Sequence, residues 1–297
     1  MLVGELSALA ASILWSFSPY IFSAVVSKIG SFNLNLTRTF VSSILLVVTC
    51  VVLKISLNPT IIQLFYLSLS GIVGLVLGDT YLFKALKEIG PRYTMILMAS
   101  NPAFGAIIAY FAFKENISLV GILGMLITFI GIYLVVYQQN EKEVTKFKIT
   151  RKGIIHGLLS AVGQAVGLVL TKYAFFLGEI NPLAATFYRV FPAFVALLLM
   201  AIFTKRLNAM FLQRLLEKRN ISLLLLGSFI GPYLGISFSF IAVTHIQVGI
   251  AATIMSLQPI LMLPISKYLQ KEKFSFQSII GAFLAVLGTS ILFLRNH

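Results

Sequence analysis

Long apolar stretches alternate with short polar ones along this chain, and the alternation predicts membrane helices. A helix needs about 20 apolar residues to cross the hydrocarbon core of a bilayer, which is about 30 Å thick. Ten stretches meet that requirement: 2–27, 34–53, 61–86, 93–113, 118–137, 153–177, 183–203, 221–244, 248–269 and 275–294. We therefore expect an all-α polytopic membrane protein with ten transmembrane helices.

The two halves of the chain resemble each other. A shift of 157 residues aligns Gly74–Val136 with Gly231–Phe293, and glycine, proline and charged positions coincide. Arg38 and Arg189 correspond at a slightly shorter offset. The sequence thus predicts three parts: a first five-helix repeat at 1–137, a charged linker loop at 138–152, and a second five-helix repeat at 153–297.

An odd number of helices in each repeat reverses the orientation of the second repeat in the membrane. Inverted repeats of this kind underlie alternating-access transporters, which bind substrate near the membrane midplane at the repeat interface. The expected fold is therefore two inverted five-helix repeats.

Composition agrees with a membrane protein: 59% of the 297 residues are hydrophobic, 11% are charged, and mean hydropathy is +0.97. The net charge of +14 does not indicate nucleic acid here, because the basic residues lie in short loops between apolar stretches. Such loops contact anionic lipid headgroups and report topology. The loops after the odd-numbered helices carry 17 basic residues and the opposite face carries three. We expect both termini to be extracytoplasmic, in a bacterial or archaeal plasma membrane.

Several other features argue against a disulfide, a metal site and a cleaved signal peptide. Cys50 is the only cysteine, so no disulfide can form within the chain, and no cluster of residues has metal-ligand spacing. The sequence gives no indication of a cofactor. The first apolar stretch lacks a basic leading region and is too long for a signal peptide, so we interpret it as the first membrane helix.

Two segments at the ends of the halves are similar to the EamA family of the drug/metabolite transporter superfamily. They are FAFKENISLVGILGMLITFIGIYLV (Phe111–Val135) and KYLQKEKFSFQSIIGAFLAVLGTSI (Lys267–Ile291). Trp15 and the arginines of the second and seventh helices also stand in places typical of the family, whereas Gln164 replaces a second tryptophan. The resemblance implies a transporter of amino acids or other small metabolites, frequently an exporter.

Two prolines mark a candidate substrate site. Pro102 and Pro259 are equivalent in the repeat and lie near the middle of the fourth and ninth helices, each directly after a side-chain amide, Asn101 or Gln258. Proline removes a backbone hydrogen bond, and a freed carbonyl at the midplane must line a cavity or find a partner. We favour a substrate site over the alternative, a kink bonded to neighbouring helices.

Asp79 is the only acidic residue well inside an apolar stretch. A carboxylate at that depth must be neutral, paired or in a water-filled cavity. Arg38 enters the membrane from the same face, so the two side chains can pair. We favour a structural ion pair, and a role of Asp79 in coupling transport to protons is the alternative.

The second half lacks this carboxylate, because Ile236 stands where the repeat places Asp79. Lys172 and Arg189 therefore suit a carboxylate or phosphate of a substrate. An equally weighted alternative is that Lys172 extends to the interface and Arg189 binds helix-end carbonyls.

Other polar and aromatic residues complete the candidate site. Trp15, Tyr81, Tyr233 and the amide of Gln164 are expected to line the cavity. Glu115 and Glu272 end the fourth and ninth helices and are expected to cap the helices that follow.

The sequence predicts a secondary transporter that acts on small polar molecules and lies in contact with membrane lipids. A lipid flippase or an energy-independent facilitator fits the same features. An intramembrane enzyme fits less well, because motifs such as HExxH and GxSxG do not occur. The sequence leaves open whether the protein is a monomer or a homodimer.

Overall fold

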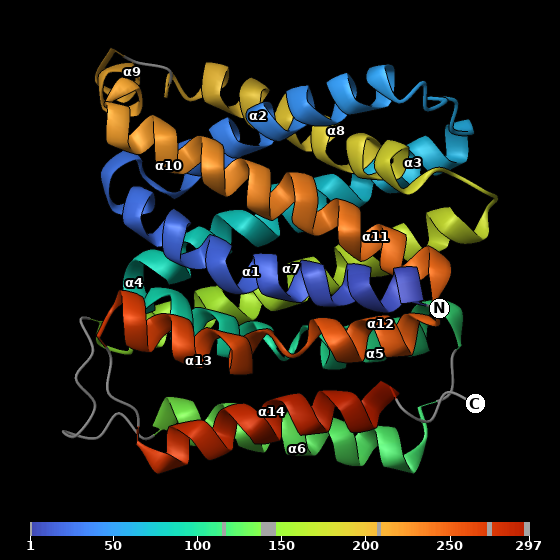
Figure 1. Cartoon of the computed structure of the whole chain (residues 1–297), viewed down its shortest axis with the longest axis vertical. Coiled ribbons are helices and arrows are strands. Elements are labelled where there is room, and N and C mark those ends of the chain that lie inside the picture. The colour runs from blue at the N-terminus through green and yellow to red at the C-terminus, as the bar shows by residue number, and fades with distance from the viewer. Residues whose placement is uncertain (1, 115–116, 138–146, 207–208, 272–274, 294–297) are drawn as a thin grey trace.

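The computed structural model describes residues 2–114, 117–137, 147–206, 209–271 and 275–293, which form helices and no strands. The helices lie side by side, and their ends gather at two opposite edges of the bundle (Figure 1). Eight helices in these ranges are long and apolar enough to cross a membrane, and two shorter apolar helices accompany them. The prediction of an all-helical polytopic membrane protein is confirmed.

The first half of the chain contains α1 (Leu2–Ile29), α2 (Ser31–Val52), α3 (Ile61–Gly71), the π-helical segment η1 (Ile72–Gly78), α4 (Asp79–Met98), α5 (Asn101–Phe113) and α6 (Leu119–Tyr137). The second half contains α7 (Arg151–Phe176), α8 (Pro182–Phe203), α9 (Ala209–Leu216), α10 (Lys218–Ser228), the π-helical segment η2 (Phe229–Gly235), α11 (Ile236–His245), α12 (Val248–Met255), α13 (Gln258–Leu269) and α14 (Phe276–Phe293).

Local sequence signals explain where several helices begin. Thr60 precedes α3 and forms a capping box, in which its hydroxyl accepts from the Gln63 amide and the Gln63 side chain accepts from the Thr60 amide. Asn181 caps α8, where Pro182 occupies the first helical position. These residues satisfy backbone N–H groups that a helix start otherwise leaves unpaired.

The expected boundary between the third and fourth helices needs correction. The expected loop at 87–92 is only a turn at Gly90, with φ 78° and ψ 171°, and the helix resumes at Pro91. Glycine adopts this left-handed backbone without the steric cost of a Cβ, and proline suits a helix start. Eight full-length spans are counted because the merged stretch Ile61–Met98 leaves only the short helix Asn101–Ala112 for the rest of the fourth helix, and because the described part of the tenth, Phe276–Leu292, is also short.

Two expected helices are interrupted. The fourth breaks between α4 and α5, and the ninth breaks between α12 and α13, just before Pro102 and Pro259. Both prolines stand in the first turn of the helix that follows, because the ring is compatible with a helix start and not with an interior. The polar stretch 204–220 holds the short amphipathic helix α9, which the apolar pattern did not predict.

Irregular backbone recurs at equivalent positions in the two halves. The π-helical segments η1 and η2 are 157 residues apart, and so are the breaks before α5 and α13. Four non-glycine residues of the described ranges have positive φ, and they form two repeat pairs: Lys54 with Lys205, and Lys114 with Lys271.

The packing of the halves follows the same correspondence. α2 packs against α8, α1 packs against η2 and α11, and α7 packs against η1 and α4. α6 and α14 form the most extensive contact and lie together at one end of the bundle (Figure 1). Two glycine pairs make their close approach possible: a Cβ on Gly124 would lie 2.6 Å from the Gly288 oxygen, and one on Gly131 would lie 2.5 Å from the Gly281 oxygen. Small residues at such contacts are typical of helix pairs in membranes.

The outer surface of the bundle is apolar, as a lipid-facing surface requires. Leu126 on α6 and Phe283 on α14 are 52% and 53% exposed, whereas buried positions hold polar side chains such as Asn35, Arg38 and Asp79. The outer surface thus differs from that of a water-soluble protein, and polar side chains lie in the bundle interior among a largely apolar core.

Candidate functional site

An ion pair between α2 and α4 lies inside the bundle. The Arg38 guanidinium Nη2 pairs with the Asp79 carboxylate Oδ2, and the two residues are 5% and 3% exposed. Asn35, one turn before Arg38, accepts from Arg38 Nε at 3.1 Å and donates to the Leu75 carbonyl at 2.6 Å. The Phe83 ring centroid lies 4.9 Å from the guanidinium carbon. Nε and Nη2 of the guanidinium and both carboxylate oxygens therefore have polar partners.

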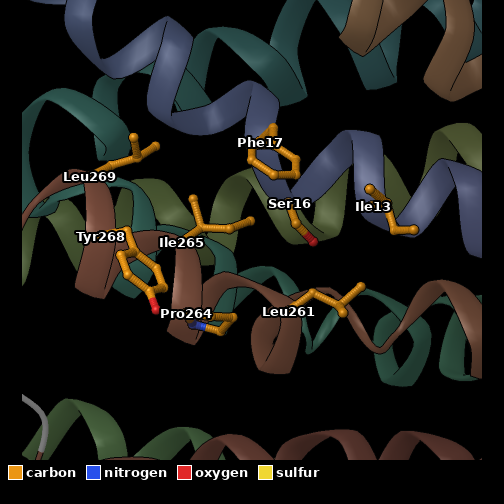
Figure 2. Close-up of a pocket in the computed structure, with 8 residues that line it drawn as sticks. All are labelled: Ile13, Ser16, Phe17, Leu261, Pro264, Ile265, Tyr268 and Leu269. Atoms are coloured by element: carbon orange, nitrogen blue, oxygen red, sulfur yellow. The ribbon is translucent and has the colours of Figure 1, made fainter.

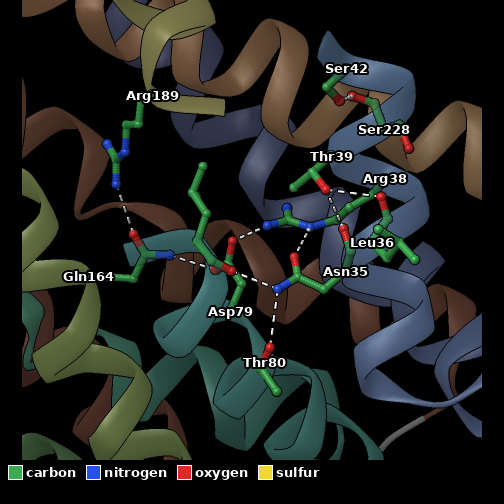
Figure 3. A network of polar contacts seen from close by, with 11 residues as sticks. Asn35, Leu36, Arg38, Thr39, Ser42, Asp79, Thr80, Gln164, Arg189 and Ser228 are labelled. Atoms are coloured by element: carbon green, nitrogen blue, oxygen red, sulfur yellow. Dashed lines mark hydrogen bonds and ion pairs between the residues drawn. The ribbon is translucent and has the colours of Figure 1, made fainter. Parts of the chain in front are cut away.

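The network continues from Asp79 into the second half of the chain. Gln164 on α7 donates from Nε2 to Asp79 Oδ1 at 2.5 Å, and Gln164 Oε1 accepts from Arg189 Nη2 at 3.2 Å. Figure 3 shows this chain of contacts from Arg38 through Asp79 and Gln164 to Arg189. Helices α2, α4, α7 and α8 are thus joined by four side chains, with two guanidinium groups and one carboxylate among them.

Small residues bring these side chains together. A Cβ on Gly74 of η1 would lie 2.9 Å from Arg189 Nη2, and one on Gly163 of α7 would lie 2.9 Å from the Gly78 Cα. η1 and α7 can therefore approach closely at the level of the network. π-helical turns within α-helices are frequent at functional sites, and η1 ends directly before Asp79.

The break between α12 and α13 is bonded to α1. Ser12 donates at 3.4 Å to the carbonyl of Met255, which Pro259 leaves without its helical partner. The Ser16 hydroxyl donates to the Ser12 carbonyl at 2.7 Å and lies 3.4 Å from the Gln258 carbonyl. The Gln258 side chain donates to the Trp15 carbonyl at 2.5 Å. The alternative of a kink bonded to a neighbouring helix thus describes the geometry of this break.

The equivalent break between α4 and α5 has a different environment. α7 occupies the place of α1, and where Ser12 and Ser16 stand in α1, at an offset of 149 residues, α7 has Ala161 and Ala165. Asn101 is half-buried, and its side chain makes no hydrogen bond within the described part of the chain. Of the two amides predicted to contact substrate, Asn101 is therefore the one that remains available.

The other predicted site residues contact groups different from those of the network. Tyr81 packs 5.6 Å from the His156 ring, the Tyr233 hydroxyl lies 2.7 Å from that of Thr49, and Lys172 Nζ is 5.6 Å from the Phe176 ring. The Trp15 indole borders Gly235. Glu115 and Glu272 lie outside the described residues, so their predicted capping role stays a prediction.

Sequence reasoning missed two partners. Asn35 belongs to the network, and its spacing of three residues from Arg38 on one helix was the available signal. Glu88 lies 3.2 Å from His156 and joins α4 to α7 near the Gly90 turn. No local sequence pattern indicates that pair, because 68 residues separate its members.

A surface groove of about 400 Å³ runs between α1 and α13. Figure 2 shows the residues that line it: Ile13, Ser16, Phe17, Leu261, Pro264, Ile265, Tyr268 and Leu269. Its lining is apolar except for two hydroxyl groups, and the Ser16 hydroxyl already donates to the Ser12 carbonyl at 2.7 Å. The groove therefore suits hydrocarbon and offers little to a polar molecule. Among the described residues, no group of three or more acidic, histidine or cysteine side chains could hold a metal ion.

These features define an integral membrane protein with several helical spans and a polar network inside the bundle. A sequence model of the EamA-like transporter family matches residues 2–137 and 151–294, and the chain belongs to this family. The resemblance to the drug/metabolite transporter superfamily is thereby confirmed.

Individual relatives agree with this assignment. The chain is 26% identical over 136 residues to an uncharacterized transporter, YyaM, of Bacillus subtilis (strain 168). That match covers 46% of this chain and 44% of the relative, less than half of the relative's length. A protein of known crystal structure is 17% identical and superposes with a TM-score of 0.68 over 99% of this chain and 98% of that one, which shows a shared fold.

Proposed function

We propose that this transporter exports small polar metabolites, such as amino acids, by alternating access between two inverted five-helix repeats. One observation carries the proposal: the fourth and ninth helices are both interrupted, at positions 157 residues apart, in the middle of an apolar bundle. Discontinuous helices at the midplane of inverted repeats are where secondary transporters bind substrate. The interruption before α5 would contact substrate through Asn101, and the one before α13 would hold α1 in place.

The proposed orientation in the membrane rests on charge. The bundle edge at which α1 begins and α14 ends is the edge with few basic residues (Figure 1). The positive-inside rule then places both termini outside the cytoplasm, in the plasma membrane of a bacterium or archaeon. Export as the direction of transport is supported by the family resemblance.

Lipid transport is the competing function. A flippase must carry a charged or polar headgroup past the midplane, and the groove between α1 and α13 offers that headgroup only two hydroxyl groups. Arg38, Asp79, Gln164 and Arg189 do not line that groove, so it does not present their polar groups to a headgroup. The geometry therefore favours a soluble metabolite.

Counterflow in proteoliposomes tests the proposal. Vesicles loaded with an unlabelled metabolite should take up the same labelled metabolite transiently, without ATP, for at least one member of a panel of amino acids and related compounds. Repeating the assay with and without a pH gradient separates proton coupling from facilitation. Movement of fluorescent lipid between leaflets with no metabolite exchange would support the flippase instead.

A further inference from the structure

Arg38 and Arg189 have the same place in their helices. Each lies seven residues after the first residue of a 22-residue helix, Ser31 in α2 and Pro182 in α8. The two helices pack together and run in opposite directions (Figure 1). The surroundings of the two guanidinium groups can therefore be compared residue by residue. Equivalent residues are 151 positions apart in α2 and α8, and 157 positions apart in α4 and α11.

The surroundings of Arg38 supply it with acceptors. Asn35 accepts from Nε at 3.1 Å and Asp79 pairs with Nη2, so both donors on one edge of the guanidinium are occupied. This edge, Nε with Nη2, can bind a carboxylate with two parallel hydrogen bonds.

The surroundings of Arg189 do not supply it with equivalent acceptors. Thr186 stands at the position of Asn35, and its hydroxyl donates to the Pro182 carbonyl at 2.8 Å. Ile236 stands at the position of Asp79. Arg189 Nε is buried without a hydrogen-bond partner, and Arg189 Nη2 reaches only the neutral amide of Gln164, at 3.2 Å. No carboxylate of the described residues lies within ion-pair distance of Arg189.

Because Arg189 is buried, its lack of an anionic partner among the described residues carries a large cost in free energy. Arg189 is 2% exposed, and a buried cation is strongly unfavourable unless an anion and hydrogen-bond acceptors compensate it. An amide contributes a partial charge only, and a charge-assisted pair is roughly twice as strong as a neutral hydrogen bond. The aromatic ring of Phe240, 5.8 Å from the guanidinium carbon, adds a weaker contact.

We infer that Arg189 binds a carboxylate of the transported metabolite on its Nε and Nη2 edge. The carboxylate displaces Gln164 Oε1 from Nη2, while Gln164 Nε2 keeps its contact with Asp79. Access requires η1 and α7 to separate, because Gly74 and Gly167 lie against the guanidinium. The inference rests on the proposed transport function and specifies its substrate class, a small metabolite with a carboxylate.

Thermal unfolding of the purified protein in detergent tests the inference without knowledge of the natural substrate. The probes are acetate, lactate and L-alanine, each measured against its neutral amide: acetamide, lactamide and L-alaninamide. The unfolding temperature should rise with carboxylate concentration and stay unchanged with the amides. Arg189→Gln should abolish the rise. Arg206→Gln, which alters an exposed arginine, should retain it.

A second pair of variants supplies the missing acceptor. Ile236→Asp places a carboxylate where Asp79 stands in the other half, and it should eliminate the effect of the added carboxylates. Ile236→Asn has the same shape without the charge and should leave that effect in place. If Ile236→Asp does not fold, the comparison of Arg189→Gln with Arg206→Gln still decides.

Three results would overturn the inference: no rise with any carboxylate, an equal rise with the amides, or a rise that persists in Arg189→Gln. Chloride provides a further arm, since saturable stabilisation by chloride alone would indicate an inorganic anion instead. Failure here is distinguishable from failure of the transport proposal. Counterflow of a neutral or cationic metabolite that Arg189→Gln leaves unchanged would support the transport function and refute the carboxylate site at Arg189.

Discussion

Asp79 and Gln164 connect two arginines that occupy equivalent positions in oppositely directed helices. The contact between Asp79 Oδ1 and Gln164 Nε2, at 2.5 Å, is the step that crosses from one half of the chain to the other. A conformational change that moves α7 relative to η1 and α4 must alter this contact, because Gln164 lies on α7 and Asp79 opens α4. The network therefore links the ion pair of the first half to the substrate site inferred in the second.

The first prediction concerns the ion pair. Asp79→Asn should destabilise the protein by about 3–5 kcal/mol, because it leaves the Arg38 charge buried without its partner. Arg38→Gln combined with Asp79→Asn should recover part of that loss. Thermal unfolding in detergent measures both effects.

The alternative role of Asp79 gives the opposite pattern. A proton-coupling carboxylate predicts that Asp79→Asn folds with normal stability, loses transport driven by a pH gradient and keeps exchange. Normal gradient-driven transport in a stable Asp79→Asn variant would eliminate the coupling role.

The second prediction separates the two amides next to the helix breaks. Gln258→Leu should lower the unfolding temperature, because it removes the hydrogen bond between the Gln258 side chain and the Trp15 carbonyl, which joins α13 to α1. Asn101→Leu should leave the unfolding temperature almost unchanged and weaken substrate binding by roughly ten- to a hundred-fold, the cost of about 1–3 kcal/mol for an unmatched polar group. Equal stability and unchanged affinity for both variants would place the site elsewhere.

The third prediction concerns the contact between α6 and α14. Gly131→Ala should destabilise the protein, because the added Cβ would lie 2.4 Å from the Ala285 nitrogen. Gly105→Ala on α5 is the matched control, since a Cβ there meets nothing within 4 Å and alanine favours the helix. The two unfolding temperatures should shift in opposite directions, and similar shifts would contradict the close packing of this pair.

The fourth prediction concerns topology. Ser56 follows α2 and Thr204 follows α8, and both residues are exposed. After Cys50→Ala, Ser56→Cys should react with an impermeant maleimide added to intact cells, and Thr204→Cys should react only after the cells are opened. Labelling of both from outside would refute the ten-helix count or the orientation.

Hydrophobic patterning predicted the helical class of this fold because long apolar stretches recur along the chain. The spacing of Pro102 and Pro259 located the helix breaks, although each break falls just before its proline, where the ring no longer disturbs a helix interior. The polar partners were harder to predict. Ser12 and Ser16 resemble any serines in a membrane helix. Only the packing of α1 against α12 and α13 shows that Ser12 bonds to the freed Met255 carbonyl and that Ser16 lies beside the Gln258 carbonyl.

The environment of Arg189 could also be predicted only in part. The repeat showed that Ile236 replaces the expected carboxylate, so an unbalanced cation was predictable. The partner it does have, Gln164, lies on a helix whose contacts no local pattern specifies. Lys172, predicted as the second cation of the pair, is two helical turns beyond Gln164 on α7 and is not part of the network shown in Figure 3.

Side-specific labelling of a cysteine at position 101 tests the central claim most directly. In a Cys50→Ala background, Asn101→Cys should react with an impermeant maleimide from either face of the membrane in separate experiments, and a transported metabolite should slow both reactions. This is the behaviour of a midplane site that opens alternately to each side. Reaction from one face only, in the presence and absence of every transported metabolite, would contradict alternating access at this helix break.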